Sequence, residues 1–259
     1  MNNKKFISTA KDIINLEIRA LQKLKKQLNV SFSKAVDQIA KCQSKVILCG
    51  VGKSGLIASK IAATFSSVGT PSFSISANDC SHGDLGSITK KDVLILISNS
   101  GNSEELKNII QYANRYKVKL ISIVSKKNST LYKAADIKIL LPEVMEADHN
   151  KIVPTSSTII QLAIGDALAV ASMKFRKFGK LDFKKFHPGG SLSIQLKTVE
   201  DLMITGKKIP YIYENKKMNN ALKVISEKKL GVLIIINKKK QIKGIITDGD
   251  IKRALQKNT

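Results

Sequence analysis

The sequence predicts an α/β fold with a five-stranded parallel sheet, followed by a small α+β unit. Five short apolar runs alternate with helical patterns between residues 46 and 141. Short buried strands that alternate with helices form parallel sheets covered on both faces. Two of these runs end in loops rich in glycine and hydroxyl side chains, at residues 50–55 and 98–103. From residue 198 the pattern restarts with shorter elements, which indicates a second unit.

Two helices are predicted ahead of the sheet, because apolar residues recur at helical spacing over 6–28 and again over 33–42. The strands are expected at residues 46–49, 72–75, 93–97, 120–124 and 137–141. Helices are expected after most strands, over residues 54–67, 103–116 and 129–134.

A long helix is predicted over residues 156–178, with Thr155 or Ser156 as its N-cap. Residues 179–196 are less regular and are interpreted as a domain boundary or as an active-site tail. The domains are therefore expected at 1–196 and 197–259. Within the second, we expect a turn at 199–203, an extended segment at 209–213 and a helix at 219–228. Two strands at 232–236 and 242–247, joined by a polar hairpin connection, and a final helix at 248–255 are expected to follow.

The net charge of +24 does not by itself predict nucleic-acid binding. Only four of the 44 basic residues are arginines, namely Arg19, Arg115, Arg176 and Arg253. Base readout and tight phosphate clamping favour the planar guanidinium group, and the lysines are spread along the whole chain. We interpret the charge as solvated faces that can still attract anionic substrates.

The cysteines and the apolar runs indicate the cellular compartment of the protein. Three cysteines without a Cys-x-x-Cys spacing indicate neither a disulfide framework nor a zinc knuckle. The polar N-terminus has no signal-peptide pattern. The longest apolar stretch, 159–173, contains Gln161 and Asp166 and is shorter than a bilayer span of ~20 residues. We expect a cytoplasmic protein that binds neither membrane nor nucleic acid.

The two loops at strand ends predict a phosphate-binding site. Free backbone N–H groups and helix N-termini gather beyond the carboxyl ends of parallel strands, where they bind anions. The residues expected to hold the substrate and its phosphate are Gly52, Ser54, Gly55, Ser98, Asn99, Ser100, Ser103, Thr155, Ser156, Ser157 and Thr158. The same region carries Lys53, His82 and Glu105, and a cation, an imidazole and a carboxylate beside phosphate favour an active site over a passive pocket.

Six ordered motifs resemble the sugar isomerase (SIS) family, and within it the arabinose-5-phosphate isomerases. They are Gly-Val-Gly-Lys-Ser-Gly at 50–55, Ser-His-Gly-Asp-Leu-Gly at 81–86, Ser-Asn-Ser-Gly at 98–101, Pro-Thr-Ser-Ser-Thr at 154–158, Gly-Asp-Ala-Leu-Ala at 165–169 and His-Pro-Gly-Gly at 187–190. The C-terminal unit resembles a CBS motif, through Gly-Ile-Ile-Thr-Asp-Gly-Asp at 244–250. The resemblance implies an SIS-type three-layer sandwich with a CBS motif behind it.

The resemblance also implies an activity and a site. The activity is aldose–ketose isomerisation of D-arabinose 5-phosphate and D-ribulose 5-phosphate through a cis-enediol, which would feed 3-deoxy-D-manno-octulosonate and lipopolysaccharide synthesis. The implied catalytic residues are Lys53, His82, Glu105, Glu146 and His187. Glu105 is expected to be the proton-transfer base and Lys53 to neutralise enediolate charge. His187 is expected in ring opening or as partner acid/base, and His82 to orient or protonate an oxygen.

Several alternatives remain open at this point. Glu105 could merely complement a helix dipole. No cofactor is implied and no metal is required, although Zn²⁺ at His82 and His187 would inhibit. The protein could instead isomerise another sugar phosphate, or be a non-catalytic sugar-phosphate sensor.

Two departures from the family pattern matter. Family members usually carry two CBS motifs, whereas this chain has one, which would expose Val232, Ile234, Ile236, Ile245 or their neighbours. We therefore expect a homotetramer in which CBS motifs pair between subunits. The charged run 148–151 departs from the family and affects the loop near Glu146.

Overall fold

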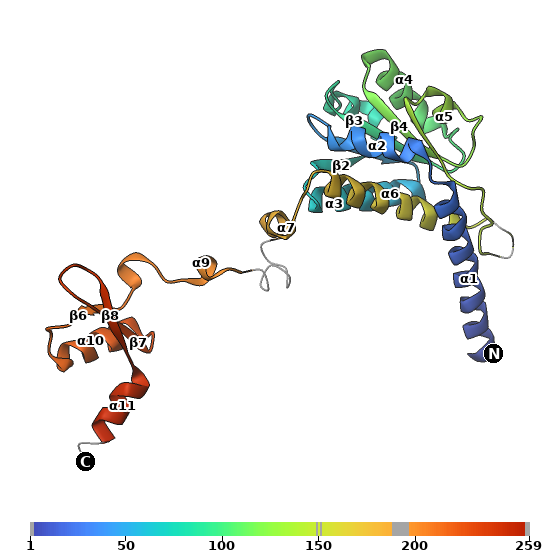
Figure 1. The fold of residues 1–259 in the computed structure, drawn as a ribbon. Coiled ribbons are helices and arrows are strands. Elements are labelled where there is room, and N and C mark those ends of the chain that lie inside the picture. The colour runs from blue at the N-terminus through green and yellow to red at the C-terminus, as the bar shows by residue number, and fades with distance from the viewer. Residues whose placement is uncertain (1–2, 149, 151, 188–196, 257–259) are drawn as a thin grey trace. The chain divides into compact units, whose positions relative to one another are not determined.

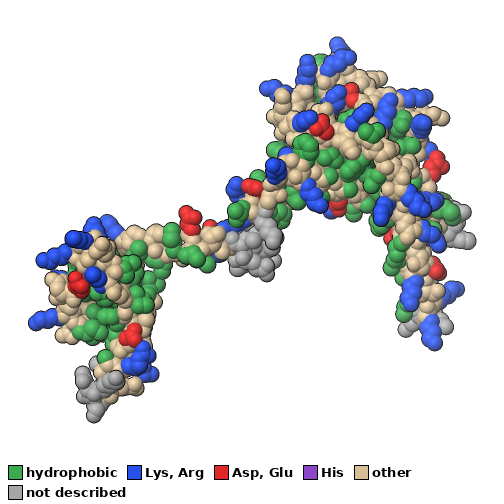
Figure 2. Space-filling model, viewed as in Figure 1, with side chains coloured by type: hydrophobic (Ala, Val, Ile, Leu, Met, Phe, Trp, Pro, Cys, Tyr) green, Lys and Arg blue, Asp and Glu red, His purple; other side chains and the backbone are tan. Residues whose placement is uncertain are grey.

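The computed structural model describes residues 3–148, 150, 152–187 and 197–256, which form two compact units. The first unit is Met1–Leu196 and the second is Lys197–Thr259. Figure 1 shows both units. Lys and Arg side chains are scattered over the visible surface of each unit and do not gather in one patch (Figure 2).

The first unit is built on a five-stranded, wholly parallel sheet, which confirms the predicted fold class. Its order is β2-β1-β3-β4-β5. The strands are β1 (Val46–Gly50), β2 (Ser72–Ser76), β3 (Val93–Ser98), β4 (Lys119–Val124) and β5 (Ile137–Leu140). β1 and β3 are fully buried because they lie in the middle of the sheet and both of their faces are covered.

Helices cover both faces of this sheet, so the unit has the expected three layers. On one face Val46 and Leu48 pack with α1 (Asn3–Gln27), α2 (Val30–Ala40), α3 (Lys53–Ser67) and α6 (Ser156–Phe175). On the other face Ile47 and Cys49 pack with α4 (Lys107–Tyr116) and α5 (Thr130–Ala134). Alternate residues of β1 thus enter opposite cores, as the pleat of a strand requires.

Two element boundaries differ from the predictions. The long helix α6 ends at Phe175 rather than at residue 178, because Lys177 adopts a left-handed conformation (φ 56°) and the N–H of Phe178 turns back to the carbonyl of Met173. In the segment expected to be irregular, a helix α7 (Lys180–Phe186) forms, with Asp182 accepting the N–H of Gly179. Residues 188–196, which include part of the His-Pro-Gly-Gly motif, lie outside the described residues.

Helix α6 passes the length and composition test for a membrane span, with a mean hydropathy of 1.4 over its most apolar window. Nine of its residues are buried, and it packs against α1, α2 and α3. We therefore assign α6 to the core of the first unit. No other helix in the described residues passes the test.

The second unit is a three-stranded sheet with helices, as predicted. Its strands are β6 (Tyr211–Tyr213), β7 (Val232–Ile236) and β8 (Ile242–Thr247), in the order β6-β7-β8. Its helices are α9 (Val199–Leu202), α10 (Met218–Lys228) and α11 (Asp248–Gln256). Leu233 packs with Ala221 and Ile225 of α10 in a small core.

The other side of this small sheet carries an exposed apolar row. Register places Tyr211 opposite Ile234, and Ile234 opposite Ile245. Tyr211 is 51% and Ile245 61% exposed. The expectation that Ile236 would be among the exposed residues was wrong, since only 8% of it is exposed.

Candidate active site

The candidate site lies at the carboxyl edge of the large sheet, around the loops that follow β1 and β3. These strands are neighbours, and the chain leaves them toward opposite sides of the sheet, since β2 lies beside β1 and β4 beside β3. Such a switch point opens a crevice between two loops at the carboxyl ends of the strands. The fold therefore places both predicted phosphate loops at one crevice.

The loop after β1 is shaped by glycines that let backbone approach backbone. A Cβ on Gly50 would lie 2.8 Å from the carbonyl carbon of Ser54, and one on Gly55 would lie 2.8 Å from the carbonyl oxygen of Gly50. Gly52 has φ 57°, which favours glycine. This tight turn starts α3 at Lys53, whose side chain is exposed at the crevice, with Ser54 next to it.

The loop after β3 is held by its own serines. The buried Ser98 hydroxyl accepts the N–H of Gly101 at 3.0 Å and lies 3.2 Å from the Ser103 hydroxyl. The Asn99 amide oxygen accepts the Ser125 hydroxyl at 2.7 Å. Ser98 thus shapes the loop, whereas Ser100 is exposed at its surface.

Glu146 caps the N-terminus of α6. One of its carboxylate oxygens, Oε2, accepts the N–H of Thr155 at 2.8 Å, the Thr155 hydroxyl at 3.1 Å and the N–H of Ser157 at 3.2 Å. Desolvation acts to raise the pKa of Glu146, but hydrogen bonds from Ser157 and Thr155 outweigh it and lower this pKa. Glu146 is therefore an ionised carboxylate that already occupies part of the predicted anion site at 155–158.

A cavity of about 330 Å³ joins these loops. It is lined by Val51, Lys53, Ser54, Asn99, Glu146, Ile152, Pro154, Ser157, Thr158 and Gln161. The fold thus brings together predicted site residues from four separate segments of the chain. Gln161 is not among the predicted residues, although its place one turn after Ser157 puts it on the same face of α6.

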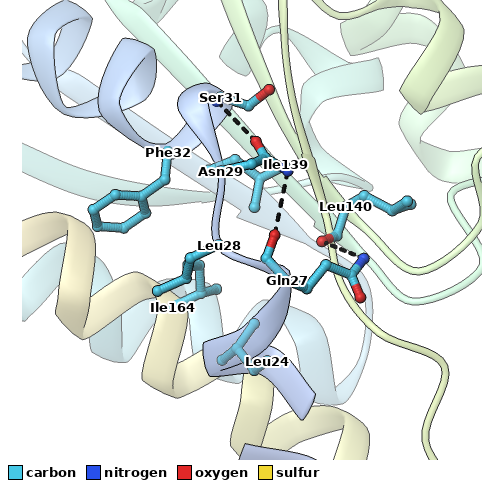
Figure 3. A pocket seen from close by; sticks show the side chains of 9 residues that line it. All are labelled: Leu24, Gln27, Leu28, Asn29, Ser31, Phe32, Ile139, Leu140 and Ile164. Atoms are coloured by element: carbon cyan, nitrogen blue, oxygen red, sulfur yellow. Dashed lines mark hydrogen bonds between the residues drawn. The ribbon is translucent and has the colours of Figure 1, made fainter. Parts of the chain in front are cut away.

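A smaller cavity between the α1–α2 turn, β5 and α6 is not a substrate site (Figure 3). Its volume is about 10 Å³, which accommodates about one water molecule. Gln27 donates to the carbonyl oxygen of Leu140 at its rim, at 3.1 Å (Figure 3). This cavity belongs to the packing of α1 against the sheet.

His82 and Glu105 lie beside the crevice without lining the cavity. His82 ends the turn Asp79–His82 after β2, and Glu105 lies in the turn Glu104–Leu106 after β3. The Asn108 amide donates to the Ser81 hydroxyl at 3.0 Å, which joins the turn that carries His82 to the first turn of α4, directly after the turn that carries Glu105. Both His82 and Glu105 are exposed.

His187 is not brought to the crevice of its own chain. It follows α7, which lies beyond the C-terminal end of α6 (Figure 1). The 20 residues of α6 make this helix about 30 Å long. Nδ1 of His187 lies 2.9 Å from the carbonyl oxygen of Phe183, and the His187 ring stacks on the Phe183 ring at 3.7 Å. The nearby Arg176 binds the carbonyl of Gly69, just before β2 begins. His187 therefore lies toward the amino edge of the sheet.

This separation bears on metal binding. Because His82 and His187 lie toward opposite edges of the sheet, one chain does not bring these two histidines to a shared zinc ion. Among the residues that the structure describes, no group of three or more His, Cys, Asp or Glu side chains is placed to hold a metal.

The fold and site define a class of protein. A parallel α/β sandwich with a serine-lined loop after β3 and a Gly-Lys-Ser turn after β1 is the arrangement of an SIS domain, and residues 38–171 match the SIS domain family. Residues 199–257 match the CBS domain family.

Individual relatives indicate which SIS proteins the chain is similar to in sequence and structure. Arabinose 5-phosphate isomerase KdsD of Yersinia pestis is 43% identical over 249 residues, which are 96% of this chain and 76% of that protein. KdsD of Escherichia coli strain K12 is 41% identical with the same coverage. A solved structure, E. coli CFT073 c3406 in complex with arabinose 5-phosphate, superposes with a TM-score of 0.70 at 38% identity, and covers 73% of this chain and 100% of that chain. The chain belongs to the arabinose 5-phosphate isomerase family.

Proposed function

We propose that this protein interconverts D-arabinose 5-phosphate and D-ribulose 5-phosphate. The observation that carries the proposal is the cavity beside both strand-end loops, which places the Lys53 cation near serine and threonine hydroxyls. Family membership supplies the substrate, since the relatives named above are arabinose 5-phosphate isomerases and c3406 was solved with arabinose 5-phosphate. We further propose that the reaction takes place in the cytoplasm and precedes 3-deoxy-D-manno-octulosonate synthesis.

The chemistry requires a base, an acid and a cation. A base removes the proton from C2 of the open-chain aldose while the C1 oxygen gains a proton, which gives the cis-enediol. A proton then returns to C1 and the C2 hydroxyl loses its proton, which gives the ketose. We propose Glu105 as the base, because its exposed carboxylate lies in the turn Glu104–Leu106 that follows the loop 98–103. Lys53 stabilises the charge that develops on the enediol oxygens.

Glu146 has a different part in this scheme. Its lowered pKa and its bonds to Thr155 and Ser157 make it a weak proton acceptor, and they hold α6 in place. It contributes negative charge and shape to the cavity wall. The doubly charged phosphate is then better accommodated beside the serines of loop 98–103 than at the capped end of α6.

His187 requires a second subunit. Because it lies toward the amino edge of its own sheet, we propose that His187 of a neighbouring copy completes each site. Exposed apolar side chains on α1, namely Phe6, Ile7, Ile14 and Ile18, are available for subunit contacts, and Figure 1 shows α1 projecting beyond the sheet. We propose a homotetramer in which the Tyr211–Ile234–Ile245 rows of two CBS units pair.

Incubating the full chain with a panel of sugar phosphates tests the function. We expect D-arabinose 5-phosphate to be converted to a ketose with a kcat/KM at least a hundredfold above that for other aldose phosphates. Faster turnover of another pentose or hexose phosphate would contradict the substrate. Saturable binding without any turnover would identify the sensor instead.

A further inference from the structure

Gln161 is a buried polar residue at the floor of the cavity. Only 1% of its surface is exposed, yet the residue contributes to the cavity lining. Its position is fixed by the close packing of α6 on α3, because a Cβ on Gly165 would lie 2.1 Å from Cδ1 of Ile61. That close approach, one turn further along α6, brings the Gln161 amide against Ser54 at the start of α3.

The hydrogen bonds of Gln161 are incomplete. The Ser54 hydroxyl donates to its Oε1 at 3.0 Å. Its Nε2 group, which carries two N–H donors, has no partner among the described residues. Nε2 is not among the buried atoms without a hydrogen-bond partner, so it is open to the cavity that Gln161 lines, and its two N–H groups are available to a bound molecule. The unused donors therefore point to a ligand in the cavity.

The Ser54–Gln161 pair presents one donor and one acceptor to that ligand. With the Ser54 hydrogen committed to Oε1, the lone pairs of Ser54 face the cavity beside the Gln161 N–H groups. If the Gln161 amide is flipped, Nε2 donates to the Ser54 oxygen. The Ser54 hydroxyl is then the donor toward the ligand, and Oε1 is the acceptor. Either orientation offers one group of each kind.

This pairing fits a hydroxyl group and not a phosphate. A hydroxyl both donates and accepts, whereas a phosphate at neutral pH mainly accepts and needs donors only. The ionised Glu146 carboxylate lines the same cavity and further disfavours a second anion there. We propose that Ser54 and Gln161 together bind a hydroxyl of the sugar, which rests on the proposed sugar-phosphate substrate, and that Ser54 does not bind the phosphate.

The test compares three variants with the wild-type full chain: Gln161→Met, which keeps the volume and removes the amide, Ser54→Ala, and the two combined. Binding of D-arabinose 5-phosphate and of inorganic phosphate is measured by calorimetry, with kcat and KM for the sugar phosphate. We expect Gln161→Met to weaken sugar-phosphate binding five- to tenfold, since it removes a ligand hydrogen bond. Inorganic phosphate affinity should stay within twofold, and the double variant should lose little more than the worse single one.

Equal weakening of sugar phosphate and inorganic phosphate would overturn the proposal, because Gln161 would then serve the phosphate group. Unchanged binding of both would also overturn it, and Gln161 would be a structural residue. Wild-type binding of arabinose 5-phosphate without turnover would remove the isomerase function but leave the binding comparison decisive. If arabinose 5-phosphate fails to bind the wild-type protein at all, both proposals fall.

Discussion

Glu146 accepts two hydrogen bonds from Thr155, from its N–H at 2.8 Å and from its hydroxyl at 3.1 Å. This contact fixes the loop after β5 to the first turn of α6. It fills, with a carboxylate of the chain itself, a helix N-terminus that would otherwise attract an anion. Because the Glu146 carboxylate already lies at the N-terminus of α6, we expect the negatively charged phosphate of the substrate to bind elsewhere in the cavity.

The Glu146 cap predicts a pH-dependent contribution to stability. Replacing Glu146 with Gln should lower the free energy of unfolding by about 1 kcal/mol at pH 7, as expected for a lost helix cap. The folded-state pKa of Glu146 is lowered from 4.5, so its stabilisation is complete above that ordinary value and is lost as the pH falls through the lowered folded-state pKa. Denaturant unfolding between pH 7 and pH 3 measures it. A difference between wild type and variant that stays constant down to pH 3 would contradict the cap.

Lys53 should act on the transition state more than on stability. Because the Lys53 side chain is exposed at the crevice, Lys53→Met should leave the melting temperature nearly unchanged and lower kcat at least a hundredfold. The matched control is Lys91→Met, an exposed lysine just before β3 at the opposite edge of the sheet. Steady-state kinetics of both variants measures how much kcat each substitution removes. Equal losses would show that general charge attraction, not position, accounts for the effect.

The remote placement of His187 predicts complementation between subunits. Lys53→Met and His187→Ala should each be nearly inactive alone. When the two chains are co-expressed, or unfolded and refolded together, some mixed sites would combine an intact Lys53 with an intact His187 of the neighbour. We expect activity to recover to as much as about a quarter of the wild-type level if two chains form each site at random. No recovery in mixed oligomers verified by mass spectrometry would place both residues within one chain.

The apolar row of the small sheet predicts an assembly contact. Ile245→Lys places a charge at the β8 end of the Tyr211–Ile234–Ile245 row, which should separate paired CBS units and reduce the oligomer mass measured by light scattering. Lys243→Glu, at an exposed position of the same strand, is the control and should keep the mass. An unchanged mass for Ile245→Lys would show that this face does not pair.

Much of the fold could be predicted from local pattern. The strands β7 and β8 begin and end at the predicted residues, and the five strands of the large sheet differ by one residue or less at each end. The strand predictions succeeded because a short apolar run bounded by turn residues is typical of a buried strand. Helix α7 could not be predicted, because its residues 180–186 are mostly charged or aromatic and show no clear apolar stripe.

The site was harder to predict than the fold. Motif positions indicated Lys53, Ser54 and Glu146, and the cavity gathers them. Sequence could not show that Glu146 caps α6, because that contact depends on how the loop after β5 closes over the helix. In the sequence, Gln161 is only a polar residue in an apolar stretch. Its place in the cavity wall depends on the close packing of α6 on α3, which the local sequence pattern does not indicate.

The central claim is that this protein moves a proton between C2 and C1 with Glu105 as base. The most direct test is ¹H NMR of the full chain with D-arabinose 5-phosphate in D₂O, alongside Glu105→Gln. The control is Glu104→Gln, whose parent side chain is 77% exposed and pairs with Lys107.

We predict that wild type and Glu104→Gln form ribulose 5-phosphate with solvent deuterium at the exchanging carbon, whereas Glu105→Gln shows no exchange. Deuterium incorporation by Glu105→Gln at the wild-type rate would contradict Glu105 as the base, and product without any deuterium in the wild type would contradict a solvent-exchanging enediol.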